Sequence, residues 1–290
     1  MPDRFALVLH GGAGARRHVN YDREIAHMRG LVEAARDRLR GGASAVDVVV
    51  ETVAALESSG LYVAGRGASP NTDGRYELDA SLMDGTGHAG AVAALQGFES
   101  PIRAARAVLE RTNHVLLAGE GAAAFARAQA LSEIGDPDGW FTRAGAEDDN
   151  HPPGGLSHGT VGCVVLDGAG RLAAGTSTGG VFGKRPGRVG DTPLIGAGSW
   201  ADGRVAVSCT GQGEFFILTS AASQVAHRMA FGGETLEDAA QATIGSVGAL
   251  GGDGGLIAVD RDGNIAMPWN SEGMKRGWLT GAGEIGAAAF

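Results

Sequence analysis

Residues 158–163 read His-Gly-Thr-Val-Gly-Cys, and they join two parts of the chain that differ in character. Before them, residues 134–158 are rich in acidic residues, proline and glycine and have no hydrophobic periodicity, so we expect a mobile linker. After them, the apolar run from Val161 to Leu166 is typical of a buried strand. A hydroxyl residue, Thr160, therefore stands at the junction between a linker and a strand.

This junction offers a route to a nucleophile. If the Gly159–Thr160 bond were cut, Thr160 would gain a free α-amino group within reach of its own hydroxyl. An α-amine titrates at roughly 7.7–8.0, so a useful fraction is neutral near pH 7 and can act as a general base. Glycine before the threonine has no Cβ, which lets the peptide strain so that the hydroxyl approaches its carbonyl. A lone Gly-Thr pair is more often an ordinary strand start, because threonine favours strands.

Around the junction, apolar strands and amphipathic helices occur in both halves of the chain. Strands are expected at 5–9, 91–95, 161–166, 171–177, 256–259 and 265–269. Helices are expected at about 25–39, 44–56, 100–111, 120–131, 214–231 and 235–250. The first rests on apolar residues three and four apart, among them Met28, Val32 and Ala35, and the second on Ser44 as its cap. The Asp-Gly-Ala-Gly turn at 167–170 would join the strands 161–166 and 171–177 into a hairpin. Residues 11–14 are expected to form a glycine turn, and residues 60–90 are turn-rich. Two packed sheets with helices outside would cover both faces of each sheet, whereas the strand order does not follow from the sequence.

Composition narrows the class of protein. The chain has 290 residues, 50 of them glycine, and a net charge of −9 without a basic stripe, which argues against nucleic-acid binding. Cys163 and Cys209 lie in apolar segments and indicate buried free thiols in a reducing compartment. The apolar run 5–9 is too short for a signal peptide or a membrane span, so a soluble, cytoplasmic protein is expected. The eight histidines have no metal-ligand spacing, so they are interpreted as ordinary residues and no side-chain metal site is expected.

Further sequence blocks follow one another in a recognisable order. They are His-Gly-Gly-Ala-Gly at 10–14, Leu-Asp-Ala-Ser-Leu-Met-Asp-Gly at 78–85, Thr-Ser-Thr-Gly-Gly at 176–180, Gly-Arg-Val-Gly-Asp-Thr-Pro at 187–193, Cys-Thr-Gly-Gln-Gly-Glu at 209–214 and Asn-Ser-Glu-Gly-Met at 270–274. With these blocks and the Gly-Thr-Val-Gly junction, nearly the whole chain resembles the plant-type L-asparaginase and isoaspartyl peptidase family of N-terminal-nucleophile (Ntn) hydrolases. The Gly159–Thr160 pair alone would not be specific for this family.

The resemblance implies a fold and a maturation step. The fold is α+β, a four-layer αββα sandwich of the Ntn-hydrolase type that spans residues 1–290 as a single domain. Self-cleavage would divide the domain into an α subunit, 1–159, and a β subunit, 160–290, and two such αβ units would form a homodimer. The implied activity is release of L-aspartate from L-asparagine, from β-aspartyl (isoaspartyl) dipeptides, or from both, without a cofactor.

The resemblance also implies catalytic roles at and near the junction. Thr160 would be the nucleophile, freed by cleavage of the Gly159–Thr160 bond, and Thr178 would lie beside it and polarise its hydroxyl and amine. The Thr210 hydroxyl and the Gly211 amide would line the oxyanion hole, where the loss of one donor costs about 10²–10³ in rate.

Three further residues would bind the substrate. Arg188 would clamp the α-carboxylate, because a guanidinium group fits a carboxylate with two parallel hydrogen bonds. Asp191 would bind the α-ammonium group, and Gly213 would let the backbone approach the substrate. Together Arg188 and Asp191 would hold a zwitterionic amino-acid head.

The chain departs from the family pattern at one position. Residues 61–65 read Leu-Tyr-Val-Ala-Gly, and the family usually has asparagine where Val63 stands. The valine side chain cannot form a hydrogen bond. The sequence therefore leaves open how the oxyanion is stabilised and how fast the chain cleaves itself. Family members also tend to bind sodium through backbone carbonyls, which here would be those near residues 55–63.

Two alternatives remain at the level of sequence. A glycosylasparaginase-like hydrolase would share the fold and the threonine chemistry, and access loops would set the size of its substrate. A protein of another class, uncleaved and catalytically silent, would serve as a binding or scaffold member, and Val63 is its main support. The intact set Thr160, Thr178, Arg188, Asp191 and Thr210 argues against it.

Overall fold

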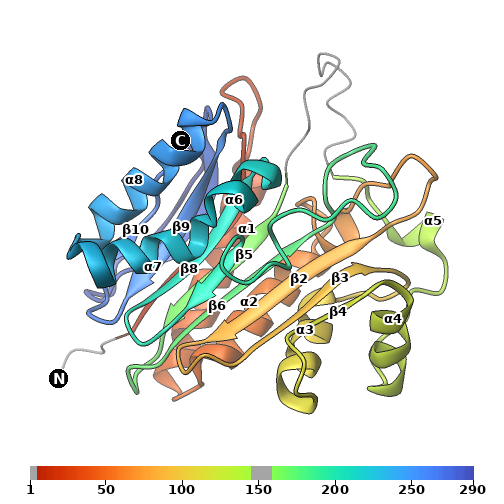
Figure 1. Cartoon of the computed structure of the whole chain (residues 1–290), viewed down its shortest axis with the longest axis horizontal. Coiled ribbons are helices and arrows are strands. Elements are labelled where there is room, and N and C mark those ends of the chain that lie inside the picture. Colours follow the sequence, from red (N-terminus) through yellow and green to blue (C-terminus); the bar gives the residue numbers. More distant parts are fainter. Residues whose placement is uncertain (1–4, 145–158) are drawn as a thin grey trace.

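The computed structural model describes residues 5–144 and 159–290, and in this part of the chain the strands form two stacked sheets (Figure 1). The larger sheet has the order β12-β11-β1-β5-β6-β2-β3-β4, and the smaller has the order β10-β9-β8-β7. The strands of the larger sheet are β1 (Ala6–Ala13), β2 (Leu78–Asp84), β3 (Ala89–Leu95), β4 (Leu116–Ala118), β5 (Val161–Leu166), β6 (Leu172–Thr178), β11 (Met274–Leu279) and β12 (Ile285–Ala288). Those of the smaller are β7 (Ser199–Ala201), β8 (Val205–Gly211), β9 (Gly254–Asp260) and β10 (Ile265–Ala266).

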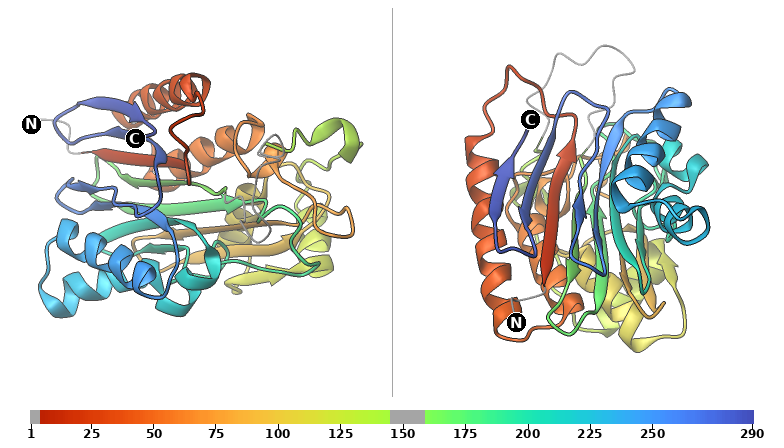
Figure 2. Two further views of the ribbon diagram at one scale, coloured as in Figure 1. Left: turned by 90° about the horizontal axis from the view of Figure 1, so that it is seen from above. Right: turned by 90° about the vertical axis from the view of Figure 1, so that its left-hand side faces the viewer.

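Helices cover the outer face of each sheet, so the chain has the four layers that the resemblance implied (Figure 2). The helices are α1 (Asp22–Arg40), α2 (Ala45–Ser58), α3 (Pro101–Arg111), α4 (Gly119–Ala128), α5 (Pro137–Trp140), α6 (Gly213–Thr219), α7 (Ala221–Gly232) and α8 (Leu236–Ala249), with a 3₁₀ turn at Gly65–Gly67. Helices α1 to α4 pack on the larger sheet and α6 to α8 on the smaller, while a third apolar cluster fills the space between the sheets. The α+β class is confirmed. No helix among the described residues is long and apolar enough to cross a membrane.

Local sequence explains why helices α1 and α2 form. In α1, Met28, Val32 and Ala35 are buried at spacings of about one turn, which makes one face of the helix part of the core. The Ser44 side chain accepts a hydrogen bond from the Asp47 N–H and caps α2, as the sequence predicted.

Two expectations about local structure are wrong, and a third omitted a strand. The glycines at 11–14 do not end the first strand, because β1 continues to Ala13 through a register shift after His10. Residues 60–90 contain a buried strand, β2, besides their turns. The single helix expected at 214–231 is two helices, because Ser220 adopts the left-handed conformation with φ 49° and breaks the helix there.

Strands from the two sides of the junction are interleaved in the larger sheet. Strand β5 follows the junction and lies between β1, which precedes it, and β6. On the other side of β1 lies β11, from the end of the chain, and β6 pairs with β2. The pairing of β5 with β6 brings Val161 opposite Ser177, which places Thr160 near Thr178.

The segment expected as a linker is described only in its first part. Residues 134–144 contact the body of the protein: the Phe141 ring stacks on Tyr76, and the Thr142 hydroxyl donates to the Gly60 carbonyl at 2.7 Å. The rest, 145–158, lies outside the described residues, so mobility of the linker stays a prediction.

Candidate active site

A small pocket at the junction contains every predicted site residue except Thr210. It is lined by Gly159, Thr160, Thr178, Gly180, Val181, Arg188, Gly190, Asp191, Thr192, Gly211 and Gly213. These residues come from the ends of β5, β6 and β8, from the loop that joins β6 to β7 and from the start of α6. The free volume is about 10 Å³, close to the space that one water molecule requires.

Hydrogen bonds converge on the bond between Gly159 and Thr160. The Thr178 hydroxyl donates to the Gly159 carbonyl oxygen at 2.6 Å and accepts from the Gly180 N–H at 3.0 Å. The Thr160 hydroxyl donates toward Thr178 Oγ1 at 3.4 Å. A carbonyl that accepts a short hydrogen bond and the hydroxyl of Thr160 therefore flank the Gly159–Thr160 bond.

Val63 packs directly against Gly159. A Cβ on Gly159 would lie 2.2 Å from Cβ of Val63, so no larger residue fits there without a shift. The Val63 carbonyl accepts a hydrogen bond from the Gly179 N–H at 2.9 Å, which ties this position to the end of β6. The one departure from the family pattern thus touches the junction itself.

Arg188 is held by a carboxylate. Its Nε and Nη2 atoms donate to the two carboxylate oxygens of Glu214 at 3.0 and 2.9 Å. The Arg188 side chain is 17% exposed and that of Glu214 is 53% exposed. A substrate carboxylate could bind this guanidinium in the same way, because two parallel hydrogen bonds are the geometry that carboxylates and guanidinium groups share. Sequence reasoning missed Glu214, although it ends the 209–214 block, because spacing does not reveal which charge Arg188 meets.

Asp191 is buried and only partly hydrogen-bonded. Burial raises the pKa of its carboxyl to about 7, against the smaller opposite effect of the Arg188 charge. Its Oδ2 atom has no hydrogen-bond partner among the described residues. A Cβ on Gly213 would lie 2.8 Å from Oδ1 of Asp191, so glycine is needed where the start of α6 passes this carboxyl. A buried carboxylate oxygen without a partner suits a cationic ligand.

Thr210 does not line the pocket in the uncut chain. Its side chain is fully buried, and its hydroxyl accepts a hydrogen bond from the Ala13 N–H at 3.1 Å. The next residue, Gly211, does line the pocket and has φ +149°, in the region that favours glycine.

A protein-family comparison decides the relationship. A family model described as "Asparaginase" matches residues 3–287. The chain belongs to this asparaginase family. The resemblance inferred from the sequence blocks is therefore confirmed over almost the whole chain.

Three relatives illustrate the membership in the asparaginase family. The isoaspartyl peptidase of Salmonella typhimurium is 46% identical over 299 residues, which covers 95% of each chain. The plant-type L-asparaginase of Pyrobaculum calidifontis is 43% identical and covers 94% of this chain and 96% of its own. The human isoaspartyl peptidase/L-asparaginase is 40% identical, with 92% and 91% covered.

The loop near residues 55–63 fits the expected sodium site only in part. The carbonyl oxygens of Ala55, Leu56 and Gly60 each accept a hydrogen bond from a serine or threonine hydroxyl. A sodium ion would share these oxygens with their present donors, so its binding stays a prediction. Among the described residues, no cluster of three or more His, Cys, Asp or Glu side chains could hold a metal ion.

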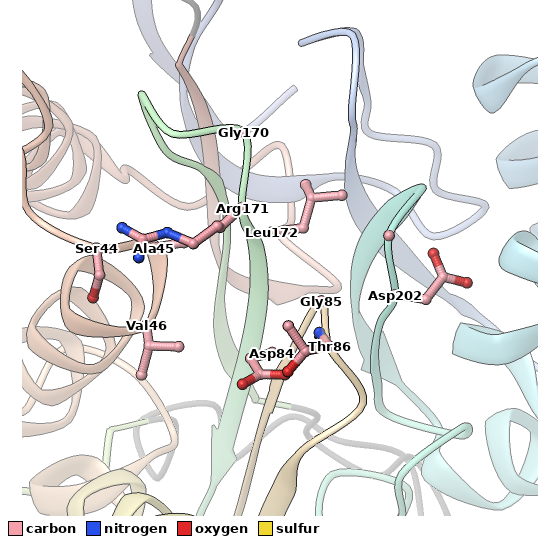
Figure 3. A pocket seen from close by; sticks show the side chains of 11 residues that line it. Ser44, Ala45, Val46, Asp84, Gly85, Thr86, Gly170, Arg171, Leu172 and Asp202 are labelled. Carbon is pink, nitrogen blue, oxygen red and sulfur yellow. Dashed lines mark hydrogen bonds between the residues drawn. The ribbon is translucent and has the colours of Figure 1, made fainter.

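A larger cavity, of about 330 Å³, lies at the opposite end of the β5–β6 hairpin (Figure 3). It is lined by Ser44, Ala45, Val46, Asp84, Gly85, Thr86, Gly170, Arg171, Leu172, Asp202 and Gly203. Its charged side chains have local partners: Arg171 pairs with Asp167, and Asp84 accepts from Thr86. We place the chemistry at the smaller pocket, because the larger one holds none of the predicted site residues.

Proposed function

We propose that this chain is an amidohydrolase that cuts itself between Gly159 and Thr160. The freed Thr160 then releases L-aspartate from L-asparagine, from β-aspartyl dipeptides, or from both. The observation that carries the proposal is the short hydrogen bond from Thr178 to the Gly159 carbonyl, with the Thr160 hydroxyl beside it. Relatives named isoaspartyl peptidase or L-asparaginase support the choice of substrates.

Self-cleavage begins with attack of Thr160 Oγ1 on the Gly159 carbonyl carbon. The developing negative charge on the Gly159 oxygen is stabilised by the Thr178 hydroxyl, which already donates to it. The hydroxyl proton of Thr160 passes to its own nitrogen as the C–N bond breaks, which leaves an ester between Gly159 and Thr160. One water molecule then splits the ester into a Gly159 carboxylate and a Thr160 with a free hydroxyl and amine.

Substrate hydrolysis reuses the same threonine. The free α-amine of Thr160 takes the hydroxyl proton while Oγ1 attacks the side-chain amide carbon of the substrate. The Gly211 N–H and the Thr210 hydroxyl would stabilise the oxyanion, and the Thr210 hydroxyl can donate while it still accepts from the Ala13 N–H. The proton moves to the leaving nitrogen, which departs as ammonia or as the amine of the second residue. Water then hydrolyses the aspartyl ester and restores Thr160.

Selection of the substrate rests on two opposite charges in the pocket. The substrate α-carboxylate would replace Glu214 on Arg188, and the α-ammonium group would supply the missing partner of Asp191. A ligand without the ammonium group would leave the buried Asp191 oxygen without a partner, and one without the carboxylate would leave Arg188 on Glu214, so neither would gain the full set of contacts.

Cleavage also has to precede binding. The uncut pocket has about 10 Å³ of free volume, whereas small-molecule sites typically offer a few hundred. Departure of Gly159 from Thr178 would open the space and release the Thr178 hydroxyl for the substrate. Self-cleavage would thus be the step that activates the protein.

The rival functions differ in their support. The catalytically silent member is favoured by one observation, the packing of Val63 without a donor against Gly159. A glycosylasparaginase-like activity has no specific observation in its favour. The proposal includes a homodimer of αβ units, which analytical ultracentrifugation can test. It also includes sodium binding near residues 55–63, which can be tested by comparing the melting temperature in sodium with that in a larger monovalent cation.

The deciding experiment is intact mass over time on purified protein, followed by assays on L-asparagine and a β-aspartyl dipeptide. We expect the 29.3 kDa chain to give two fragments that end and begin at Gly159 and Thr160, and activity to rise with their formation. A single stable chain that releases neither ammonia nor aspartate would contradict the proposal and favour the silent member.

A further inference from the structure

His10 in β1 links the junction to the space between the two sheets. Its ring is fully buried, with Nδ1 3.1 Å from the Thr160 carbonyl oxygen and Nε2 2.9 Å from Oγ of Ser208. Burial lowers its pKa to about 3, so the imidazole is neutral and carries one N–H. Because a carbonyl oxygen only accepts, Nδ1 donates to Thr160 and Nε2 accepts from the Ser208 hydroxyl.

A chain of buried hydroxyl groups continues from Ser208 across the sheet interface. Ser208 Oγ lies 2.8 Å from Thr176 Oγ1, and Thr176 contacts the Ser199 hydroxyl. Ser199 Oγ in turn lies 2.9 Å from Ser81 Oγ, and the Ser81 hydroxyl donates its single proton to the Thr192 carbonyl at 2.5 Å. His10, Thr176 and Ser81 belong to the larger sheet and Ser208 and Ser199 to the smaller, so the chain alternates between the sheets.

His10 sets the direction of the hydrogen bonds between these hydroxyl groups. Ser208 has one hydroxyl proton, which it gives to Nε2, so Thr176 has to donate to Ser208 and Ser199 to Thr176. From Ser199 through Thr176, Ser208 and His10, each hydrogen bond therefore points toward the Thr160 carbonyl, and hydrogen bonds aligned in series strengthen one another. The series ends at Ser199, because Ser199 gives its proton to Thr176 and Ser81 gives its own to the Thr192 carbonyl.

Gly162 leaves space for the contact between His10 and Ser208. A Cβ at Gly162 would lie 2.0 Å from Oγ of Ser208 and 2.5 Å from Nε2 of His10, so a side chain there would push the pair apart. This contact gives a structural reason for the second glycine of the Gly-Thr-Val-Gly junction.

The need for such a support follows from the position of the nucleophile. Once Thr160 becomes the first residue of its fragment, no preceding peptide holds it, and terminal residues are poorly ordered unless tied down. A hydrogen bond to its carbonyl fixes the backbone torsion next to the amine and side chain. Misplacement of a reacting group by about 1 Å can lower a rate by about 10².

We propose that His10 is a positioning residue that holds the Thr160 carbonyl, so that the nucleophile stays ordered after self-cleavage. The hydroxyl groups of Ser208, Thr176 and Ser199 extend this support across the two sheets. The inference rests on the proposed function for its kinetic consequences, whereas its structural consequence, the order of Thr160, can be measured without any substrate.

Two replacements of His10 separate its two hydrogen bonds. The amide nitrogen of asparagine occupies the place of Nδ1 and can still donate to Thr160, whereas that of glutamine occupies the place of Nε2 and reaches Ser208. For the cleaved protein, we expect His10→Gln to lower kcat about 10- to 100-fold with little change in KM. His10→Asn should restore kcat to within about fivefold of the unmodified protein, because it keeps the bond to Thr160. Rates are expressed per cleaved chain, as counted by intact mass.

Methyl-group relaxation of Thr160, measured by NMR on threonine-labelled protein, gives a readout without substrate. The Thr160 methyl should become more mobile in His10→Gln and remain ordered in His10→Asn. Ser208→Ala provides a second route, since it leaves the bond to Thr160 but frees the ring, and should lower kcat about threefold to tenfold. An ordered Thr160 and an unchanged kcat in His10→Gln, or equal losses in the two His10 variants, would overturn the inference. If the unmodified protein hydrolyses neither substrate, the proposed function fails, and the NMR comparison still decides the role of His10.

Discussion

The two ends of the β5–β6 hairpin differ in how well their polar groups are satisfied. At the turn end, the cavity of about 330 Å³ is lined by charged side chains with local partners, such as Arg171 with Asp167. At the junction end, the pocket of about 10 Å³ holds Asp191 with an oxygen that no described residue contacts by a hydrogen bond. The junction end also holds the short bond from Thr178 to Gly159.

Volume and chemistry are therefore separate properties of this fold. A large cavity whose polar groups are already paired has little to offer a ligand beyond space. A buried group without a partner destabilises the free protein and is retained where a ligand or a reaction supplies the partner. Matched substitutions at the two ends of the hairpin test this difference.

The largest effect is expected from Thr160→Ala at the junction end. Without the hydroxyl neither self-cleavage nor hydrolysis has a nucleophile, so the chain should stay intact and the rate should fall by about 10⁴ or more. Thr86→Ala at the turn end should leave both properties unchanged, since the hydrogen bonds of Thr86 are to its turn neighbours Asp84 and His88. Intact mass and ammonia release measure both. Cleavage that survives in Thr160→Ala would refute the mechanism.

The next effect compares two arginines. Arg188→Ala should raise KM about 10²- to 10³-fold, because a charged, bidentate contact to the substrate carboxylate is lost. Arg171→Ala removes a guanidinium group of the same kind at the turn end and should leave KM unchanged. Steady-state kinetics with a β-aspartyl dipeptide make the comparison, and equal KM values for the two variants would argue against the clamp.

A third effect compares two carboxylates and has opposite signs at the two ends. The pKa of Asp191 is raised by burial from 3.8 to about 7, so the stability it contributes below about pH 4 is lost as the pH rises toward 7. Asp191→Asn should therefore stabilise the protein at pH 8 by roughly 2–4 kcal/mol, and by less at pH 5.

Asp84 is the matched control for Asp191. Burial, which raises its pKa, is outweighed by hydrogen bonds from Thr86 and His88, so its pKa is lowered. A lowered pKa contributes stability that is present at pH 8 and lost as the pH falls through the folded-state value. Asp84→Asn should then destabilise the protein at pH 8. Urea unfolding of the Asp191→Asn and Asp84→Asn variants, each made in the uncut Thr160→Ala protein, measures both effects. Changes of the same sign in the free energy of unfolding at pH 8 would contradict the assignment.

The smallest effect concerns Val63. An asparagine at this position could donate a hydrogen bond to the charge that develops on the Gly159 oxygen, so Val63→Asn should speed self-cleavage about tenfold. Val63→Ala opens the same space without a donor and should not speed it, and Val46→Asn at the turn end should have no effect. Densitometry of the fragments over time gives the rates. Equal rates for the asparagine and alanine variants at 63 would show that packing, and not the missing donor, sets the speed.

Local signals predicted much of the fold. The spacing of Met28, Val32 and Ala35 predicted α1, and Ser44 predicted the start of α2. The alternation of apolar runs and a turn predicted the β5–β6 hairpin. In each case the information lies within a few residues, so a single sequence suffices.

Other elements depend on partners far away in the chain. Strand β11 was not predicted, because Arg276 interrupts its apolar pattern, yet this side chain packs its guanidinium 4.2 Å from the centre of the Trp269 ring. Strand β2 was hidden by the buried polar residues Asp79 and Ser81, whose partners are distant in sequence.

The candidate site was likewise predictable from the sequence only in part. Motif blocks predicted which residues gather at the junction, and the pocket contains them except for Thr210. The histidine pattern gave His10 no role, because its partners Thr160 and Ser208 lie 150 and 198 positions away. Which charge faces Arg188 was likewise beyond the sequence, since Glu214 is brought there by the turn into α6.

The interleaving of strands in the larger sheet bears on what the cut would mean for the life of the molecule. Because β1 lies between β11 and β5, the two fragments would remain joined by backbone ladders on both sides of one strand. Before the cut, assembly is a reaction within one chain, but after unfolding of the cut form it would require two chains to meet and thread into alternate places. Maturation would therefore convert a protein that can refold into one whose unfolding is, at low concentration, a permanent loss.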